Sequence, residues 1–197
     1  MSRLDDIHQI SGGHADFARG YFDYVGEILR RIDVGAASEM LKAFEDARIA
    51  GKSIYFCGNG GKAALATEWA NDLTIALEIA PAFRAFSLTD NAPIITAIGN
   101  DHGYEEVFSR QVRALAQPGD VVVGLSGSGR SSNVLAAMRA AKEIAALTIG
   151  ITGSDGGDLK HGVDISVHIP TEPDDGPIED AFMALLHMTV MRFKRLY

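Results

Sequence analysis

Hydrophobic residues follow two different patterns along the chain, and the change falls close to Gly51. Before it, residues such as Phe17, Tyr21 and Val25 recur at helical spacing. The spacing predicts two helices over 14–50, with Gly51 as a helix cap. No strand pattern precedes them, so we expect this helical pair to pack either on its own domain or against another subunit.

From residue 53 onward, short apolar runs alternate with helical stretches. The runs lie at 53–58, 83–88, 120–126, 147–152 and 164–170. Helical stretches lie near 61–79, 93–98, 104–116 and 131–145, and a long helix with Pro177 near its start closes the chain. Continuous apolar runs joined by helices predict a parallel sheet, buried on both faces, between two helical layers. Ligands of such sheets bind at the carboxyl ends of the strands, so the loops after each run are the places to search.

Composition narrows the class of protein. The 197 residues are 47% hydrophobic and carry a formal charge of −8, which argues against a nucleic-acid or anionic-membrane partner. One cysteine excludes an intrachain disulfide framework and a Cys-rich metal site. No apolar run approaches ~18 residues, and the N-terminus lacks the apolar segment of a signal peptide. With no repeat or linker, the sequence predicts one cytoplasmic α/β domain over 1–197.

The loop after the first run, 57–63, holds three glycines between a strand and a helix. Such a loop brings backbone N–H groups and the positive end of a helix dipole close to an anion. A P-loop is excluded, because Phe56 stands where its first glycine belongs and Ala63 follows Lys62. A dinucleotide fingerprint fits weakly, since the second run does not end in an acidic residue. A tight turn with packing glycines is the alternative without a ligand.

The loop after the third run, LSGSGRSSN over 125–133, is rich in hydroxyls and precedes another helix. Hydroxyls and N–H groups at a helix N-terminus suit a phosphate monoester. Arg130 adds charge there or simply faces solvent. The alternative is a serine-rich turn in which the serines serve as N-caps. Two loops suited to anions at one edge of a sheet are more informative than either alone.

Four segments together resemble a known family. They are GNGGKAA, SLTDNAPIITAIGNDHGYEEVFSRQV, LSGSGRSSNVLAA and the closing IEDAFMALLH. They are similar to the SIS (sugar isomerase) domain family and, within it, to its phosphoheptose isomerase branch. The resemblance implies a flavodoxin-like three-layer sandwich with a five-stranded parallel sheet and an N-terminal helical hairpin. It further implies a cytoplasmic homotetramer that converts sedoheptulose 7-phosphate to a heptose 7-phosphate, often with zinc at a subunit interface.

The resemblance also assigns the substrate site residue by residue. The residues it implies are Asn59, Gly60, Gly61, Asn100, Asp101, Ser126, Gly127, Ser128, Ser131 and Glu179. The serine loop would hold the phosphate, and Asn59 and its neighbours would line the sugar. The family commonly has serine where this chain has Lys62. That lysine either strengthens phosphate binding or points into solvent.

The metal and catalytic positions depart from the family pattern. Where the family has histidine and glutamate four apart, then glutamine and histidine eight apart, this chain has Glu68, Asp72, Glu179 and His187. Three carboxylates and an imidazole favour manganese, iron or magnesium more than a zinc site does. The alternatives are that Glu68 and Asp72 are solvated helix residues and that His187 is an interface histidine.

The resemblance makes Asp72 the base and His187 its partner in an enediol reaction. Aspartate in place of glutamate shortens the reach by roughly 1.5 Å, which affects the rate of proton transfer. Two other functions therefore stay open. One is a phosphosugar-binding SIS protein without turnover, of a sensor or replication-initiator-associating type. The other is an isomerase of another phosphosugar.

Overall fold

Three helices precede the sheet in the computed structural model, which describes residues 2–197. They are α1 (Arg3–Ile10), α2 (His14–Leu29) and α3 (Val34–Ile49). Helices α2 and α3 confirm the predicted pair, and Gly51 takes a left-handed φ of 67° just beyond α3. Helix α1 was not predicted, although its signal is local: Ser2 and Asp5 form a reciprocal capping box.

All five predicted strands form, and they join in one parallel sheet. The strands are β1 (Ser53–Gly58), β2 (Arg84–Ser87), β3 (Val121–Ser126), β4 (Leu147–Thr152) and β5 (Ile165–His168). Their order across the sheet is β2-β1-β3-β4-β5, with every neighbouring pair parallel. The chain order reverses between β1 and β3, which is the topological switch point where such folds bind ligands.

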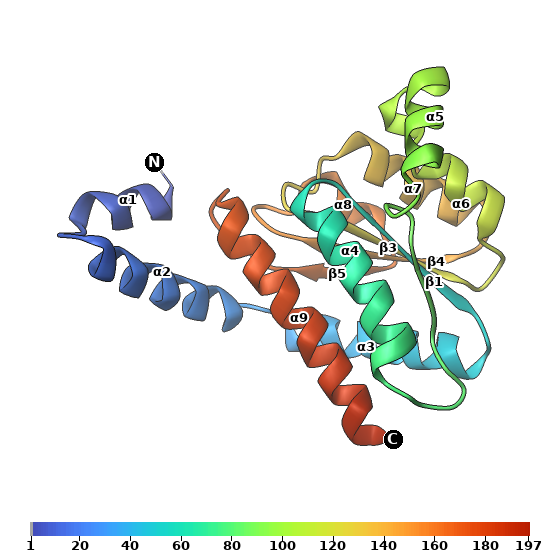
Figure 1. The fold of residues 1–197 in the computed structure, drawn as a ribbon, viewed down its shortest axis with the longest axis horizontal. Coiled ribbons are helices and arrows are strands. Elements are labelled where there is room, and N and C mark those ends of the chain that lie inside the picture. Colours follow the sequence, from blue (N-terminus) through green and yellow to red (C-terminus); the bar gives the residue numbers. More distant parts are fainter. Residues whose placement is uncertain (1) are drawn as a thin grey trace.

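Helices cover both faces of the sheet (Figure 1). They are α4 (Gly61–Asn71), α5 (Ala92–His102), α6 (Ser109–Leu115), α7 (Ser132–Glu143), α8 (Gly157–Gly162) and α9 (Asp175–Leu196). A 3₁₀ turn, η2 (Tyr104–Glu106), precedes α6, and a π-helical turn, η1 (Asp72–Ala76), continues α4. Helices α3, α4 and α9 pack on one face, whereas α6, α7 and α8 pack on the other. The three-layer sandwich is therefore confirmed, and the short helix α8 is an addition to it.

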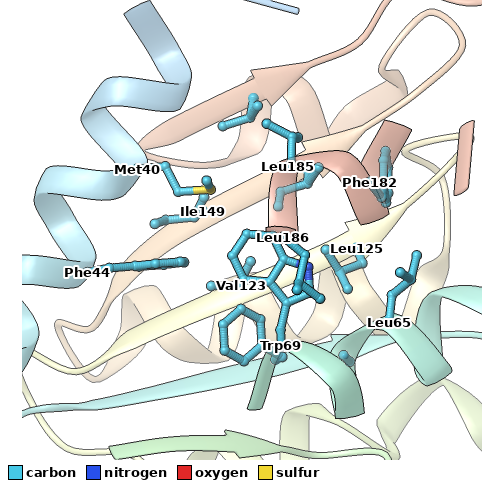
Figure 2. Packing of buried hydrophobic residues seen from close by; sticks show 14 of the residues in the cluster. Met40, Phe44, Leu65, Trp69, Val123, Leu125, Ile149, Phe182, Leu185 and Leu186 are labelled. Atoms are coloured by element: carbon cyan, nitrogen blue, oxygen red, sulfur yellow. The ribbon is translucent and has the colours of Figure 1, made fainter. Parts of the chain in front are cut away.

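The larger core lies between the sheet and the α3, α4 and α9 layer (Figure 2). Trp69 is fully buried at its centre, with its ring 5.8 Å from that of Phe44 and 5.4 Å from that of Phe56. The sequence left open whether Trp69 is a core or an interface residue. Trp69 packs α4 against both α3 and β1. The two elements that flank the loop between β1 and α4 are therefore held in place by the core.

The edge strands correct one expectation. We expected every run to be buried on both faces, and the three central strands are almost fully so. On β2, however, Arg84 and Phe86 are exposed, and β5 is only partly covered. A strand at the sheet edge has fewer neighbours, and its edge position is set by topology and not by its own residues.

Candidate functional site

A cavity of about 240 Å³ opens at the switch point, between the loops that follow β1 and β3. Its lining comes from three helix N-termini, those of α4, α7 and α9, together with the end of β3. The lining residues are Asn59, Lys62, Leu125, Ser126, Gly127, Ser128, Ser131 and Asp175. Five of these residues were predicted from the sequence to bind substrate, so the structure gathers the predicted phosphate loop around one cavity.

The hydroxyls of the serine loop, residues 126–131, bond to one another and to the backbone of the loop, and not to the first turn of α7, which is fully described. Ser131 is the N-cap residue of α7, yet it makes no side-chain capping bond to the described residues. Its Oγ instead lies 3.1 Å from the Oγ of Ser126. Ser126 Oγ also accepts a hydrogen bond from the Gly129 N–H at 3.1 Å, which holds the turn closed. This arrangement contradicts the alternative in which Ser131 is only a helix cap.

Gly129 is required by the geometry of this loop. Its φ is 67°, and a Cβ there would overlap the carbonyl oxygen of Gly156 in the loop after β4. The close approach ties the two loops together, and the Leu159 N–H donates to the Gly129 carbonyl at 3.0 Å. Arg130 points away from the cavity and forms a bidentate pair with Asp155, with N–O distances of 2.7 and 2.6 Å. It therefore takes the solvent-facing alternative.

Asn59 connects the loop after β1 to two other elements. Its side-chain amide and that of Asn133 exchange two hydrogen bonds of 2.9 Å. The Tyr104 hydroxyl donates a third, of 3.0 Å, to Asn59 Oδ1. Because Asn133 is buried on α7, this network fixes Asn59 at the cavity wall. Sequence reasoning missed Asn133 and Tyr104, although both lie inside the segments that carry the family resemblance.

The structure shows in which direction the Lys62 side chain points. Its side chain is only 12% exposed, and its Nζ lies 2.7 Å from Asp175 Oδ1 and 2.9 Å from Glu179 Oε1. A Cβ placed on Gly127 would lie 3.4 Å from the same Nζ. The ammonium is thus held between the serine loop and the first turn of α9, and it does not point into solvent.

Two opposing effects set the charge of Lys62. Burial lowers the pKa of its ammonium, while hydrogen bonds to Asp175 and Glu179 raise it, and the net result is a pKa above the ordinary value. A raised lysine pKa keeps the group charged at neutral pH. The cavity wall therefore includes a charged ammonium next to the serine hydroxyls, ion-paired with two carboxylates.

Not every predicted substrate residue lines this cavity. Gly60 and Gly61 form the start of α4, and a Cβ on Gly61 would overlap the Glu179 carboxylate, so glycine allows α9 to approach. Glu179 lies behind Lys62 and not at the cavity surface. Asn100 and Asp101 lie exposed at the end of α5 and hydrogen-bond to each other at 2.7 Å. Figure 1 shows α5 standing out from the body of the domain.

Of the four predicted metal and catalytic residues, Glu68 lies on α4 and Asp72 in the turn η1 that continues it. Glu179 and His187 lie on α9, which packs against α4 (Figure 1). Glu68 and Asp72 are half-buried on successive turns, and the Asp72 N–H bonds to the Glu68 carbonyl. Asp72 also begins the π-helical turn, a feature often found at functional sites. His187 is exposed on α9.

These residues do not fit a resident metal within one chain. Across residues 2–197, no three histidine, cysteine, aspartate or glutamate side chains are placed to hold a metal ion. Glu179 is in addition ion-paired with Lys62, and an ammonium 2.9 Å away competes with a cation for that carboxylate.

Two further findings bear on the sequence predictions. Cys57 is fully buried, and burial raises its thiol pKa to about 12, which makes it a core residue and not a nucleophile. Asp175 was missed as a cavity residue, because its role depends on α9 meeting α4 and not on any local motif. Among residues 2–197, no helix has both the length and the hydropathy to span a bilayer.

Comparison with known proteins gives the same assignment by independent routes. The sequence model of the SIS domain family matches residues 20–153. Phosphoheptose isomerase of Akkermansia muciniphila is 37% identical over 155 residues, which cover 78% of this chain and 82% of the relative. The relative of the same name from Geotalea daltonii is 41% identical over 157 residues, covering 79% of each.

Solved structures agree with the sequence relatives. Phosphoheptose isomerase GmhA from Neisseria gonorrhoeae superposes with a TM-score of 0.82 at 34% identity, covering 91% of this chain and 95% of that chain. The phosphoheptose isomerase from Francisella tularensis gives 0.81 at 25% identity, over 99% and 100%. With the switch-point cavity and its serine loop, these matches place the chain in the SIS domain family, among the phosphoheptose isomerases.

Proposed function

We propose that this chain isomerises sedoheptulose 7-phosphate to a heptose 7-phosphate, as an aldose–ketose isomerase. The observation that carries the proposal is the cavity at the switch point, in which the hydroxyls of Ser126 and Ser131 and the ammonium of Lys62 surround a space suited to a phosphate. Its volume of about 240 Å³ is below the ~300–1,000 Å³ usual for whole small-molecule sites. It therefore suits the phosphate end of the sugar, with the reacting end held elsewhere.

The reaction moves a proton between adjacent carbons. A base removes a proton from C1 of the ketose, the C–H electrons form the C1–C2 double bond of an enediol, and the C2 oxygen gains a proton. The O1 hydroxyl then loses its proton as the C1 carbonyl forms, and C2 takes up a proton. We assign the carbon proton to Asp72 and the oxygen protons to His187. The packing of α4 against α9, with Asp72 in the turn that continues α4 and His187 on α9, supports this assignment.

Self-association would complete the reacting end of the site. Several large apolar side chains of the helical segment 1–50 are exposed, among them Phe22 at 71%, Val34 at 81% and Ile49 at 65%. An apolar groove of about 340 Å³ lies between α2, α3 and α9, and every residue of α5 is described yet none is buried. These surfaces support a homotetramer, with residues 1–50 serving assembly and 51–197 binding the phosphosugar. We place this assembly in the cytoplasm on the family resemblance alone.

The test is a phosphorus NMR time course of the protein with sedoheptulose 7-phosphate, with and without Mn²⁺, Mg²⁺, Fe²⁺ or Zn²⁺. We expect a new phosphate-ester signal whose growth is proportional to protein concentration. A signal that grows only with one metal would assign that metal to a site completed by assembly. Unchanged substrate under every condition would overturn the isomerase proposal.

A second candidate is a phosphosugar-binding protein without turnover. It is favoured by one observation: within the described chain, the cavity is assembled while the group of Glu68, Asp72, Glu179 and His187 is not. In the same NMR samples, this candidate predicts a shifted or broadened substrate signal and no product. A panel of pentose, hexose and heptose phosphates then separates it from an isomerase of another phosphosugar.

A further inference from the structure

We propose that Lys62 donates a hydrogen bond to the phosphate of the bound sugar, and that Asp175 and Glu179 position its ammonium for that contact. The inference rests on the proposed function only in taking the ligand to be a phosphate monoester. It assigns a binding role to a residue that stands where the family commonly has serine.

Donor geometry supports the contact. A lysine ammonium has three N–H donors, and the two carboxylates accept two of them, at 2.7 and 2.9 Å. The third donor is left for a ligand. Because Nζ lies beside Gly127 and Lys62 lines the cavity, that donor faces the same space as the hydroxyls of Ser126 and Ser131.

Burial makes this a built arrangement and not a surface ion pair. The Lys62 side chain is 12% exposed, while Asp175 and Glu179 are 83% and 35% exposed. Exposed pairs hold a lysine loosely, because the long side chain keeps its rotamer freedom. Here the lysine stem is packed against the loop, and its carboxylates approach from α9, a separate element. The ammonium is therefore placed before any ligand arrives, which lowers the cost of binding.

Charge balance explains why a lysine is needed. Without Lys62, a phosphate in the cavity would face the Asp175 carboxylate across the wall, with Glu179 behind it. A phosphate monoester carries ≈ −1.5 to −2 charge at pH 7, so this like-charge contact would oppose binding. A serine hydroxyl at position 62 would be too short and uncharged to screen two carboxylates. Phosphate binding beside the acidic start of α9 thus requires the charge of Lys62, and the position of Lys62 requires the two carboxylates.

The experiment compares inorganic phosphate, sedoheptulose 7-phosphate and unphosphorylated sedoheptulose as ligands, measured by calorimetry. We expect Lys62→Met to weaken binding of both phosphate ligands by about 10- to 100-fold, because it removes a charge-assisted hydrogen bond. Lys62→Arg should retain most of the affinity, and the binding of unphosphorylated sedoheptulose should be unchanged. Lys42→Met is the matched control, since it removes a lysine paired with Asp46 on α3, outside the cavity.

The outcomes separate this inference from the isomerase proposal. Equal phosphate affinity in Lys62→Met and wild type would overturn the inference even if turnover is normal. Phosphate affinity that depends on Lys62, in a protein that turns over no sugar, would support the inference while removing the isomerase. If Lys62→Met fails to fold, Lys62→Met/Asp175→Asn removes the uncompensated carboxylate, and the same comparison is made with Asp175→Asn as its reference.

Discussion

The serine loop and the α4–α9 helix pair are the two regions to which we assign phosphate binding and proton transfer, and they differ in how complete a single chain makes them. The loop residues Ser126, Ser128 and Ser131 line a shared cavity with defined hydrogen bonds. The helix pair holds Asp72 and His187. Within the described chain, these residues are not part of any group of three side chains that could bind a metal ion.

The difference follows from how each half is built. The loop is six consecutive residues fixed by one turn, by the start of α7 and by contact with the adjacent loop after β4, so its hydroxyls come from one short segment. The helix pair places side chains from residues more than a hundred positions apart, on helices whose remaining faces are exposed. The proposed phosphate cavity is thus assembled within one chain, whereas the proposed reaction chemistry would depend on what covers α9 and α5.

The largest expected effect is on the helix pair. Asp72→Asn should lower kcat by about 10²–10⁴-fold, because an amide cannot remove the carbon-bound proton. Affinity for sedoheptulose 7-phosphate should stay within about twofold of wild type, since the cavity is untouched. The NMR assay and calorimetry measure the two quantities, with Glu143→Gln, which is exposed and pairs with Arg113, as control. A normal kcat in Asp72→Asn would remove this residue from the mechanism.

The next effect is on the framework of the serine loop. Gly129→Ala should lower the free energy of unfolding by about 2–5 kcal/mol, combining ~1–2 kcal/mol of left-handed strain with ~1–3 kcal/mol of overpacking. Gly51→Ala isolates the strain alone, because Gly51 has the same φ of 67° and its Cβ would meet no atom of the described residues within 4 Å. Urea denaturation gives both values. Equal losses in the two variants would show that the contact with Gly156 is unimportant.

A smaller effect is expected from one hydroxyl of the loop. Ser131→Ala should weaken phosphosugar binding by about 3- to 10-fold, because a single neutral donor to the phosphate is lost. Ser132→Ala is the matched control: it removes an exposed hydroxyl on the next residue, which does not line the cavity. Calorimetry with sedoheptulose 7-phosphate distinguishes them, and equal affinities would confine Ser131 to a structural role.

The smallest effect concerns the anchoring of α9. The Tyr21 hydroxyl donates to Asp180 Oδ2 at 2.6 Å, and burial together with this carboxylate raises its pKa to about 12. Because the folded state favours the protonated phenol, its contribution to stability is present below pH 10 and is lost between about pH 10 and 12. Ultraviolet titration should show one tyrosine ionising near pH 12 that is missing in Tyr21→Phe. Titration of Tyr21 near pH 10 would contradict the contact.

Most of the fold could be predicted from local sequence. The apolar runs at 53–58 and 147–152 coincide with β1 and β4, and the glycine-rich and serine-rich loops lie where the runs end. Parallel strands place their carboxyl ends at one edge, so two loops suited to anions predict a shared site there. Hydrophobic spacing and turn residues act over a few positions, so a single sequence was enough to predict these strands and loops.

Other features depended on tertiary structure. The exposure of β2 follows from its place at the sheet edge, and the burial of Trp69 follows from α3 and β1 meeting around it. Neither the exposure of β2 nor the burial of Trp69 can be predicted from the residues next to it in the sequence. Helix α1 was missed for another reason: its capping box is local to the sequence but covers only one helical turn.

The sequence by itself determined an acidic α/β sandwich with a phosphate-suited serine loop, because these follow from composition, periodicity and contiguous residues. Only the tertiary structure decided that Lys62 faces the loop, that Asp175 and Glu179 hold it, and that Arg130 turns away to Asp155. Side-chain direction and charge pairing depend on distant elements brought within about 3 Å, and no local pattern encodes that distance.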